Sequence, residues 1–428
     1  MSHSRNVEQK RVLVIGINCF PELTGIGRYT GEMVNWLSDN NHECSVVTTF
    51  PYYPYWKIQK PYKGNFYKKE VLKNGMLKLY RCPFYVPEKP SGLKRVIHEF
   101  SFLLSAFFVI LRLLFKKKHD EIICIAPPFH LGFLALFYRF FKGGRLTYHI
   151  QDLQIEAARD LKVLKPDWIF NVLFAMERFI LRHADRVSTI SEGMQKKVAA
   201  KTKKEVMFFP NWADTKSFFP LTEREKLKVD WDFSPTDKVV LYSGSVGEKQ
   251  GLEVLLDIAE DLKEHREIKI VICGTGPYKE TLRELSINRK LDNLLFLPLQ
   301  NNDVFNSFLN MADVHLVLQK ADASDLVMPS KLTTILSAGG LPLVTANPGT
   351  SLYDVIVKNN MGLVIPPEDY HSLKDAILNC CNGDFDAERI NARKYAEEYL
   401  DRNNILSRTF SSGSFPHISL KQDGLVPT

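Results

Sequence analysis

Strand-like and helix-like runs alternate along most of this chain, and the alternation begins anew in its second half. An apolar run at 11–17 precedes helical periodicity at 26–38, and a second series starts at 238–243. Such alternation predicts parallel sheets with helices on both faces. The 428 residues exceed one ordinary hydrophobic core and suit two. We therefore predict an α/β fold with two Rossmann-like, doubly wound parallel-sheet domains that face a cleft.

Breaks in this pattern set the expected domain limits. A charged, proline-containing stretch near 212–236 separates the halves, so we assign 1–215 to an N-terminal domain and 216–385 to a C-terminal domain. A last helix covers 386–406, and the tail 407–428 is rich in Ser, Gly and Pro and is predicted to be disordered. Residues 50–76, rich in Tyr, Pro and Lys, are predicted to form a long loop of the kind that often carries function.

Each half carries a glycine- or hydroxyl-bearing turn between a strand and a helix. The first contains Gly25 and Gly27, and the second contains Gly244 and Ser245. Backbone N–H groups and helix N-termini at such turns favour an anion. A dinucleotide fingerprint fits poorly, because several residues separate the first strand from Gly25 and no acidic residue ends the second strand. We predict a phosphate-bearing substrate bound between the two domains.

Several polar residues lie near the expected strand ends or helix starts. His149 and Asp152 end a strand-like run, where open α/β sheets place ligands. His149 is a catalytic candidate, for a sugar contact or a proton shuttle, with a structural histidine as the alternative. Asp152 is the second catalytic candidate, with a helix cap as the alternative. Lys249 and Lys331 are candidates for phosphate contacts, with solvated surface lysines as the alternative.

The composition limits which partners the protein is expected to bind and in which cellular compartment it is expected to work. A formal charge of +7 argues against a nucleic-acid partner and suits an anionic substrate or membrane face. The seven cysteines form no C-x-x-C pair, as expected for reduced thiols in a cytosolic protein. Asp384 and Asp386 form a D-x-D, which helix capping explains better than metal binding. We expect no metal site.

One stretch of the first half is almost wholly apolar. Residues 100–115 (FSFLLSAFFVILRLLF) are followed by three lysines, and 131–142 is a second apolar and basic run. The first run is shorter than the roughly 20 residues that span a bilayer. It is either a buried helix or an interfacial helix whose lysines meet anionic headgroups, so a peripheral membrane contact through residues 100–118 is a hypothesis.

These motifs together resemble the GT-B glycosyltransferases, specifically glycosyltransferase family 4 and its colanic-acid-type exopolysaccharide enzymes. The resemblance covers about residues 10–405. Its main stretches are Pro21 to Gly31, His149 to Asp152, Pro210 to Asp214, Tyr242 to Gly251, Gly274 to Pro277 and Leu326 to Ile335.

The resemblance implies a retaining transfer of a hexose or deoxyhexose, with fucose as the leading candidate, from a nucleotide-sugar donor to a lipid-linked saccharide. It implies no metal and no other cofactor, a cytoplasmic location at the inner membrane, and a last helix that crosses back to the first domain. Gly25 and Gly27 would approach the donor diphosphate, and His149 the transferred sugar. The other donor contacts carried over by position are Gly244, Ser245, Lys249, Gly276, Pro329, Ser330, Lys331 and Thr334.

Two departures from the family pattern keep other functions open. Thr334 stands where family members often carry a glutamate near the ribose, and the partner glutamate falls at or beside Leu326. Ser245 and Gln250 stand where many members carry Arg and Lys. The alternatives are a nucleotide-sugar epimerase or hydrolase on the same fold, and a non-catalytic nucleotide-binding partner in polysaccharide assembly.

Overall fold

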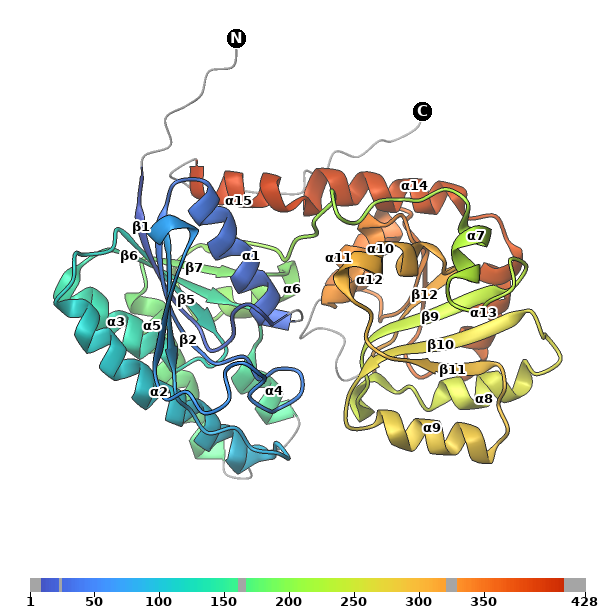
Figure 1. The fold of residues 1–428 in the computed structure, drawn as a ribbon, viewed down its shortest axis with the longest axis horizontal. Helices are drawn as coiled ribbons and strands as arrows, with labels where there is room; N and C mark the ends of the chain where they lie inside the picture. Colours follow the sequence, from blue (N-terminus) through green and yellow to red (C-terminus); the bar gives the residue numbers. More distant parts are fainter. Residues whose placement is uncertain (1–8, 23–24, 161–166, 321–328, 412–428) are drawn as a thin grey trace, which may run out of the picture. The chain divides into compact units, whose positions relative to one another are not determined.

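The structure is a computed structural model that describes residues 9–22, 25–160, 167–320 and 329–411. The chain forms two compact units. Unit 1 holds the described residues up to Pro51, Ile58–Pro210 and those from Asn403 onward, and unit 2 holds Tyr52–Lys57 and Asn211–Arg402. Apart from the short segment Tyr52–Lys57, the chain passes from unit 1 to unit 2 at Asn211 and returns to unit 1 near its C-terminus (Figure 1).

Unit 1 is built on an eight-stranded sheet in the order β3-β4-β2-β1-β5-β6-β7-β8. All neighbouring strands are parallel except β3 and β4, which are antiparallel at one edge. The strands are β1 (Arg11–Ile15), β2 (Glu43–Thr49), β3 (Lys68–Leu72), β4 (Leu77–Cys82), β5 (Glu121–Ala126), β6 (Arg145–Ile150), β7 (Arg186–Thr189) and β8 (Val206–Phe208).

Helices flank this sheet because each presents one apolar face to it. Helix α1 packs on β2 and β4, α2 packs on the same two strands, and α3 packs on β5 and β6. The helices of unit 1 are α1 (Gly25–Asp39), α2 (Gly92–Leu114), α3 (Leu131–Lys142), α4 (Gln154–Asp160), α5 (Asp167–His183), α6 (Glu192–Ala199) and α15 (Arg402–Ser411). The last of these begins one residue before unit 1 resumes.

Unit 2 repeats the architecture with six parallel strands in the order β11-β10-β9-β12-β13-β14. The strands are β9 (Lys238–Ser245), β10 (Ile268–Thr275), β11 (Leu294–Leu297), β12 (Val314–Val317), β13 (Pro342–Thr345) and β14 (Leu363–Ile365). The helices are α7 (Arg224–Val229), α8 (Val254–Asp261), α9 (Lys279–Asn288), α10 (Asn302–Asn310), α11 (Ser330–Ser337), α12 (Ser351–Lys358), α13 (Tyr370–Asn382) and α14 (Asp386–Tyr395).

The strand order locates the ligand-binding edge of each unit. Both sheets follow the doubly wound order, in which the chain reverses direction across the sheet between the first and fourth parallel strands. That switch point lies between β1 and β5 in unit 1 and between β9 and β12 in unit 2. Ligands of open α/β sheets bind outside the carboxyl ends of the strands at this point.

Two sequence predictions are wrong and need correction. Residues 50–76 are not one long loop, because they contain β3, which pairs antiparallel with β4. The predicted disordered tail begins too early, because α15 continues through Ser411. Leu406 is buried, and the Phe410 ring lies 6.3 Å from that of Trp36 in α1. Residues 412–428 lie outside the described part.

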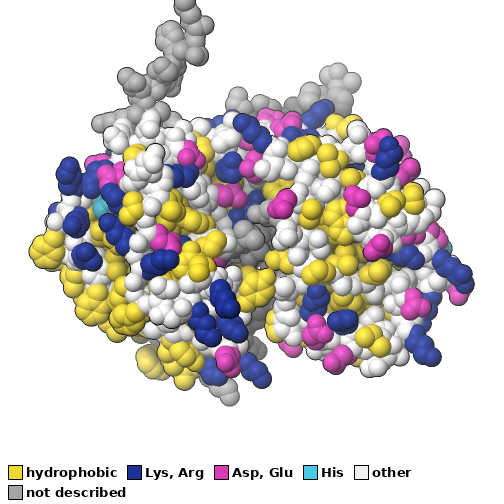
Figure 2. Space-filling view, viewed as in Figure 1, with side chains coloured by type: hydrophobic (Ala, Val, Ile, Leu, Met, Phe, Trp, Pro, Cys, Tyr) yellow, Lys and Arg dark blue, Asp and Glu magenta, His cyan; other side chains and the backbone are white. Residues whose placement is uncertain are grey.

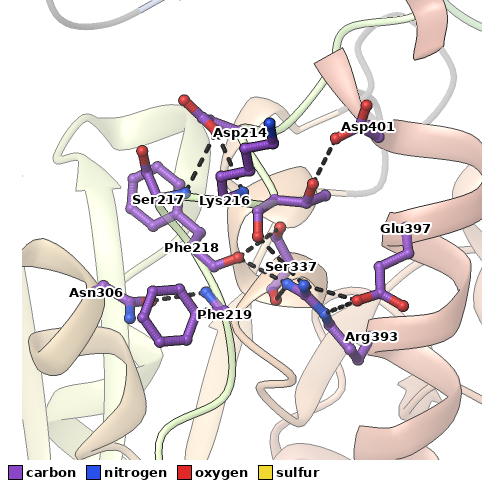
Figure 3. A network of polar contacts seen from close by, with 11 residues as sticks. Asp214, Lys216, Ser217, Phe218, Phe219, Asn306, Ser337, Arg393, Glu397 and Asp401 are labelled. Atoms are coloured by element: carbon purple, nitrogen blue, oxygen red, sulfur yellow. Dashed lines mark hydrogen bonds and ion pairs between the residues drawn. The ribbon is translucent and has the colours of Figure 1, made fainter. Parts of the chain in front are cut away.

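A partly buried arginine ties the end of unit 2 to its beginning (Figure 3). Arg393 of α14 donates to the carbonyl oxygens of Phe218 (2.8 Å), Ser337 (2.7 Å) and Thr215 (3.2 Å). Its guanidinium also pairs with Glu397 at 2.7 Å. One side chain thus connects the segment entering unit 2, the end of α11 and the last helix of the unit.

Candidate functional site

The carboxyl ends of β9 and β10 approach each other so closely that side chains are excluded there. Gly244 and Gly274 are partners in the ladder, and both have φ of +151°. A Cβ atom on Gly274 would lie 1.8 Å from the Gly244 carbonyl oxygen, and one on Gly276 would lie 2.0 Å from that of Val246. The predicted site residues Gly244 and Gly276 therefore belong to a bare stretch of backbone at the binding edge, which a ligand could approach closely.

Lys331 meets this stretch although it lies far along the chain. Its Cδ atom would be 3.8 Å from a Cβ on Gly244, and its ammonium group donates to the Leu316 carbonyl of β12 at 3.1 Å. Lys331 thus bridges β9 and β12, the two strands of the switch point. Gly244 and Lys331, two residues predicted separately as donor contacts, are therefore neighbours in the structure.

Tyr242 completes the group and was not anticipated from the sequence. The Lys331 ammonium lies 3.6 Å from the centroid of the Tyr242 ring, and the Tyr242 hydroxyl donates to the Ser245 carbonyl at 2.7 Å. The ring face stabilises a cation above it. Because Tyr242 stands two residues before Gly244 in a strand, the alternation of side chains was the one signal that placed both on the same face.

Burial lowers the pKa of Lys331 to about 7. The cause is desolvation of the ammonium group, which disfavours its charged form. The Leu316 carbonyl and the Tyr242 ring face still favour a cation at this position. A phosphate brought to the site would favour it more strongly, because an opposite charge nearby raises the pKa of a lysine.

We expect the affinity for a nucleoside diphosphate to depend on Lys331 and on pH. Above about pH 7 the free protein holds Lys331 neutral and must take up a proton to pair it with the anion, so its contribution falls as pH rises. Lys331→Met should weaken binding by about tenfold at pH 6 and by less at pH 9, since a hydrogen bond to a charged group contributes roughly 1.5–3 kcal/mol. Titration calorimetry of both proteins at the two pH values measures this.

Lys358→Met is the matched control, because Lys358 is a largely exposed lysine of the same unit. It should bind nucleotide as the wild type does at both pH values. A ratio of affinities between wild type and Lys331→Met that stays constant from pH 6 to about pH 9 would contradict a lysine with a pKa near 7.

The other residues predicted as donor contacts in unit 2 differ in their exposure and in their distance along the chain from Lys331. Pro329 precedes α11, and Ser330 is exposed at its first position. Thr334 lies one helical turn after Lys331 but is only 3% exposed. Lys249 lies in a 3-10 turn, Glu248–Gln250, and its side chain lies outside what the structure describes, as does Leu326. This turn also delays the helix after β9 until Val254.

In unit 1, His149 lies near the carboxyl end of β6, two strands from the switch point. It is 3% exposed, shares a 3.0 Å hydrogen bond with the Ser188 hydroxyl through Nδ1, and lies 4.9 Å from the Phe209 ring. Burial lowers its pKa to about 3. His149 is therefore a neutral imidazole with a fixed orientation, suited to a hydrogen bond rather than to a proton shuttle at ordinary pH.

The structure explains both glycines of the first turn by local packing and backbone conformation. Gly25 has φ of +59° and begins α1, where a glycine costs little. A Cβ on Gly27 would lie 2.4 Å from Glu22 Oε2, and Asn18 donates to the same oxygen at 2.8 Å. Gly27 thus makes room for the buried Glu22 side chain, which sequence reasoning missed. Asp152, the other predicted catalytic residue, is half-buried between β6 and α4.

A second polar group missed from the sequence lies beside the carboxyl end of β5. Gln154 donates to both carboxylate oxygens of Glu99, at 2.8 and 2.9 Å, and accepts from the Phe129 backbone at 3.2 Å. Burial raises the pKa of Glu99 to about 7. The available signal was Glu99 itself, a single acidic residue in an otherwise apolar and basic helix.

Neither a metal site nor a large cavity adds to the two binding edges among the described residues. No group of three or more His, Cys, Asp or Glu side chains suited to a metal ion occurs among the described residues. A cavity of about 20 Å³ lies at the opposite edge of the unit 1 sheet, beside Lys10, His42, Glu121 and Thr409. That volume holds about one water molecule.

Comparison with known proteins places the chain. The family described as glycosyl transferase 4-like domain matches residues 24–212, and the family described as glycosyl transferases group 1 matches residues 223–399. The chain is 38% identical over 404 residues to the Escherichia coli K12 protein named colanic acid biosynthesis glycosyl transferase WcaI, covering 92% of this chain and 98% of that protein. The chain belongs to the group 1 glycosyltransferases. As a member of this family it is a transferase enzyme, so the non-catalytic alternative loses its basis.

Solved structures confirm the GT-B fold of this glycosyltransferase. Sucrose-phosphate synthase from Thermosynechococcus elongatus superposes with a TM-score of 0.75 at 14% identity, covering 94% of this chain and 97% of that one. HepE from Anabaena, solved with UDP-glucose, superposes with a TM-score of 0.66 at 12% identity, covering 94% and 100%. At these identities the similarity concerns the fold alone.

Proposed function

We propose that this glycosyltransferase moves a hexose or deoxyhexose from a nucleoside-diphosphate sugar to a lipid-linked oligosaccharide, with retention of configuration. The observation that carries the proposal is the contact of Lys331 with Gly244 and Tyr242 at the switch point of unit 2. Bare backbone beside a lysine suits a diphosphate. The similarity to WcaI supports a role in making a colanic-acid-like exopolysaccharide, and HepE, solved with UDP-glucose, supports a nucleotide-sugar donor.

The proposed chemistry asks little of the protein beyond positioning and charge stabilisation. Lys331 and the backbone around Gly244 stabilise the diphosphate as it leaves the sugar. His149 donates or accepts one hydrogen bond at the transferred sugar. The acceptor hydroxyl gives its proton to the donor's own β-phosphate, so no protein nucleophile and no metal is needed. Nothing in this step depends on a glutamate at position 334.

We place the reaction at the cytoplasmic face of the membrane, where a lipid-linked acceptor is held. The apolar helix α2 and the lysines after it, within residues 100–118, supply the proposed peripheral contact. By length and composition α2 is the one helix among the described residues that could span a membrane. An epimerase or hydrolase is the competing function, and it would convert the donor without any acceptor.

The test is a melting panel with GDP, UDP, dTDP and ADP. A nucleotide at about 100 times its Kd adds about 2.7 kcal/mol to the stability of the protein. For a unit of this size we expect a rise of roughly 5–10 °C in Tm with one nucleotide and much smaller rises with the others. The effective nucleotide identifies the donor base. No rise with any of the four, at saturating concentration, would contradict a diphosphate site at Gly244 and Lys331.

A further inference from the structure

Helix α2 is long and apolar enough to cross a membrane, yet the fold prevents it from doing so. It has 23 residues with a mean hydropathy of 1.8 in its most apolar window, and 39% of that window is buried. Its inner face, including Phe102, Ile110 and Leu113, is buried in the core, and the helix packs on β2 and β4. Removing α2 from the sheet would expose that core to water, so α2 stays in unit 1.

The outer face of α2 is largely apolar from Leu93 to Phe108, and the exposed Arg112 follows near its end. Leu104 is 63% exposed and Phe115 is 89% exposed. The other exposed apolar residues of this stripe are Leu93, Val96, Ile97, Phe100 and Phe108. Phe100, Leu104 and Phe108 are spaced four residues apart, so they lie on one side of the helix. An outer helix of a soluble protein normally carries polar residues on this side.

The apolar surface continues over α3 and α5. The Phe107 ring of α2 lies 5.3 Å from that of Phe137 in α3, and Phe137 lies 5.0 Å from Phe141. Phe140 is 83% exposed at the end of α3. Near the start of α3, the Phe133 ring stacks on that of Phe179 in α5, with the ring centroids 6.0 Å apart. Figure 2 shows hydrophobic side chains gathered at the lower left, where Figure 1 draws α2 and α3.

The charges along α2 and α3 are nearly all positive, whereas α5 carries Asp167 and Glu177 beside Arg178 and Arg182. The segments 92–118 and 131–142 carry eight basic side chains and one acidic side chain, Glu99, which Gln154 engages. Lys116, Lys117 and Lys118 are exposed directly after Phe115. Exposed aromatic rings beside lysines are typical of segments that lie in the plane of an anionic bilayer. A protein partner would require an acidic and apolar surface of matching shape, whereas an anionic bilayer supplies both properties without any shape match.

We propose that α2, α3 and α5 together form one bilayer-docking surface that adsorbs flat onto anionic phospholipid. Its apolar rings, led by Phe108, Phe115 and Phe140, enter the boundary between headgroups and acyl chains, and Lys116 to Lys118 contact the phosphates. This inference specifies the membrane contact that the proposed function includes, and it rests on that proposed function. It extends the contact from one helix to three and requires that none of the three spans the bilayer.

The test is co-sedimentation with vesicles of phosphatidylethanolamine and phosphatidylglycerol, with phosphatidylcholine vesicles for comparison. The wild type should bind the anionic vesicles at least about tenfold more tightly than the zwitterionic ones. The triple variant Phe108→Ser, Phe115→Ser, Phe140→Ser should lose binding to both. Replacing Lys116 to Lys118 with glutamine should remove the preference for anionic lipid and leave weak binding to both.

A matched control carries the same number of serines elsewhere. Ile287, Val357 and Ile390 are exposed apolar residues of unit 2, and their replacement with serine should leave vesicle binding unchanged. Equal binding by the wild type and the Phe variant would overturn the proposal. A dimer of the wild type that the Phe variant loses, without vesicle binding by either, would overturn it in favour of self-association.

The nucleotide melting panel separates this inference from the function on which it rests. The Phe variant should keep the Tm rise with the effective nucleotide, because none of the three rings belongs to unit 2. Vesicle binding without any nucleotide response would leave the docking surface standing and remove the proposed function. A nucleotide response without vesicle binding would do the reverse.

Discussion

Replacing His149 with alanine is expected to lower turnover by about 10²-fold while leaving the Kd for the nucleoside diphosphate within about twofold, in line with the loss of one preorganised hydrogen bond. The imidazole is buried, neutral and oriented by Ser188, so it offers a fixed hydrogen bond at no cost of reorganisation. The nucleotide is proposed to bind unit 2, which does not contain His149. Release of nucleoside diphosphate from the donor, with native membranes as the acceptor source, measures turnover.

One further variant and a pH profile define the role of His149. His183→Ala removes an exposed histidine of the same unit and should leave turnover unchanged. Because the pKa of His149 is near 3, the rate of the wild type should show no titration of this group between about pH 5 and 9. Equal rates for His149→Ala and the wild type would remove His149 from the mechanism.

Replacing Arg81 with methionine is expected to destabilise the protein by about 3–5 kcal/mol, the usual cost of breaking a buried ion pair. The Arg81 side chain is 0% exposed and pairs with Glu70 at 2.8 Å. It also donates to the carbonyl oxygens of Thr49 and Phe20, at 3.1 and 3.0 Å. Methionine would leave the Glu70 carboxylate and both carbonyls without these donors. Calorimetry should show a fall in the Tm of unit 1 of roughly 10 °C.

The control for Arg81 is a basic residue of the neighbouring strand. Lys69→Met removes an exposed side chain of β3 and should change the stability by no more than about 0.5 kcal/mol. Arg81→Lys retains the charge but not the fork of donors and should lie between the two. A fall in Tm for Arg81→Met no larger than that for Lys69→Met would show that the network contributes little.

The strands and helices that the sequence predicted correctly are those with strong local periodicity. The missed strand β3 has mostly exposed side chains and two lysines, so it lacks the apolar alternation by which strands are recognised. It exists because β4 offers an unpaired edge, and Arg81 pairs with Glu70 across the two strands. Helix α15 is likewise polar in sequence, and its packing against Trp36 could not be inferred from local pattern.

The residues of the candidate site likewise divide into those found from the sequence and those missed. His149 and Gly244 were found because both stand at the ends of apolar runs, where the carboxyl edge of a parallel sheet must lie. Lys331 was found as a single lysine at a helix start, without any indication of its neighbours. Tyr242 and Glu99 were not found, because their partners Lys331 and Gln154 lie far away along the chain and meet them only in the folded protein.

The sequence by itself determined the alternation of strands and helices, the division into two α/β halves and the glycosyltransferase family. These depend on periodicity and on short motifs, which are local properties of a chain. Only the tertiary structure decided that Lys331 lies over Tyr242 beside Gly244, and that its pKa falls to about 7. It alone decided that the outer face of α2 stays exposed while the inner face is buried. Desolvation and contact depend on which distant segments the strand order brings together, and no local pattern contains that information.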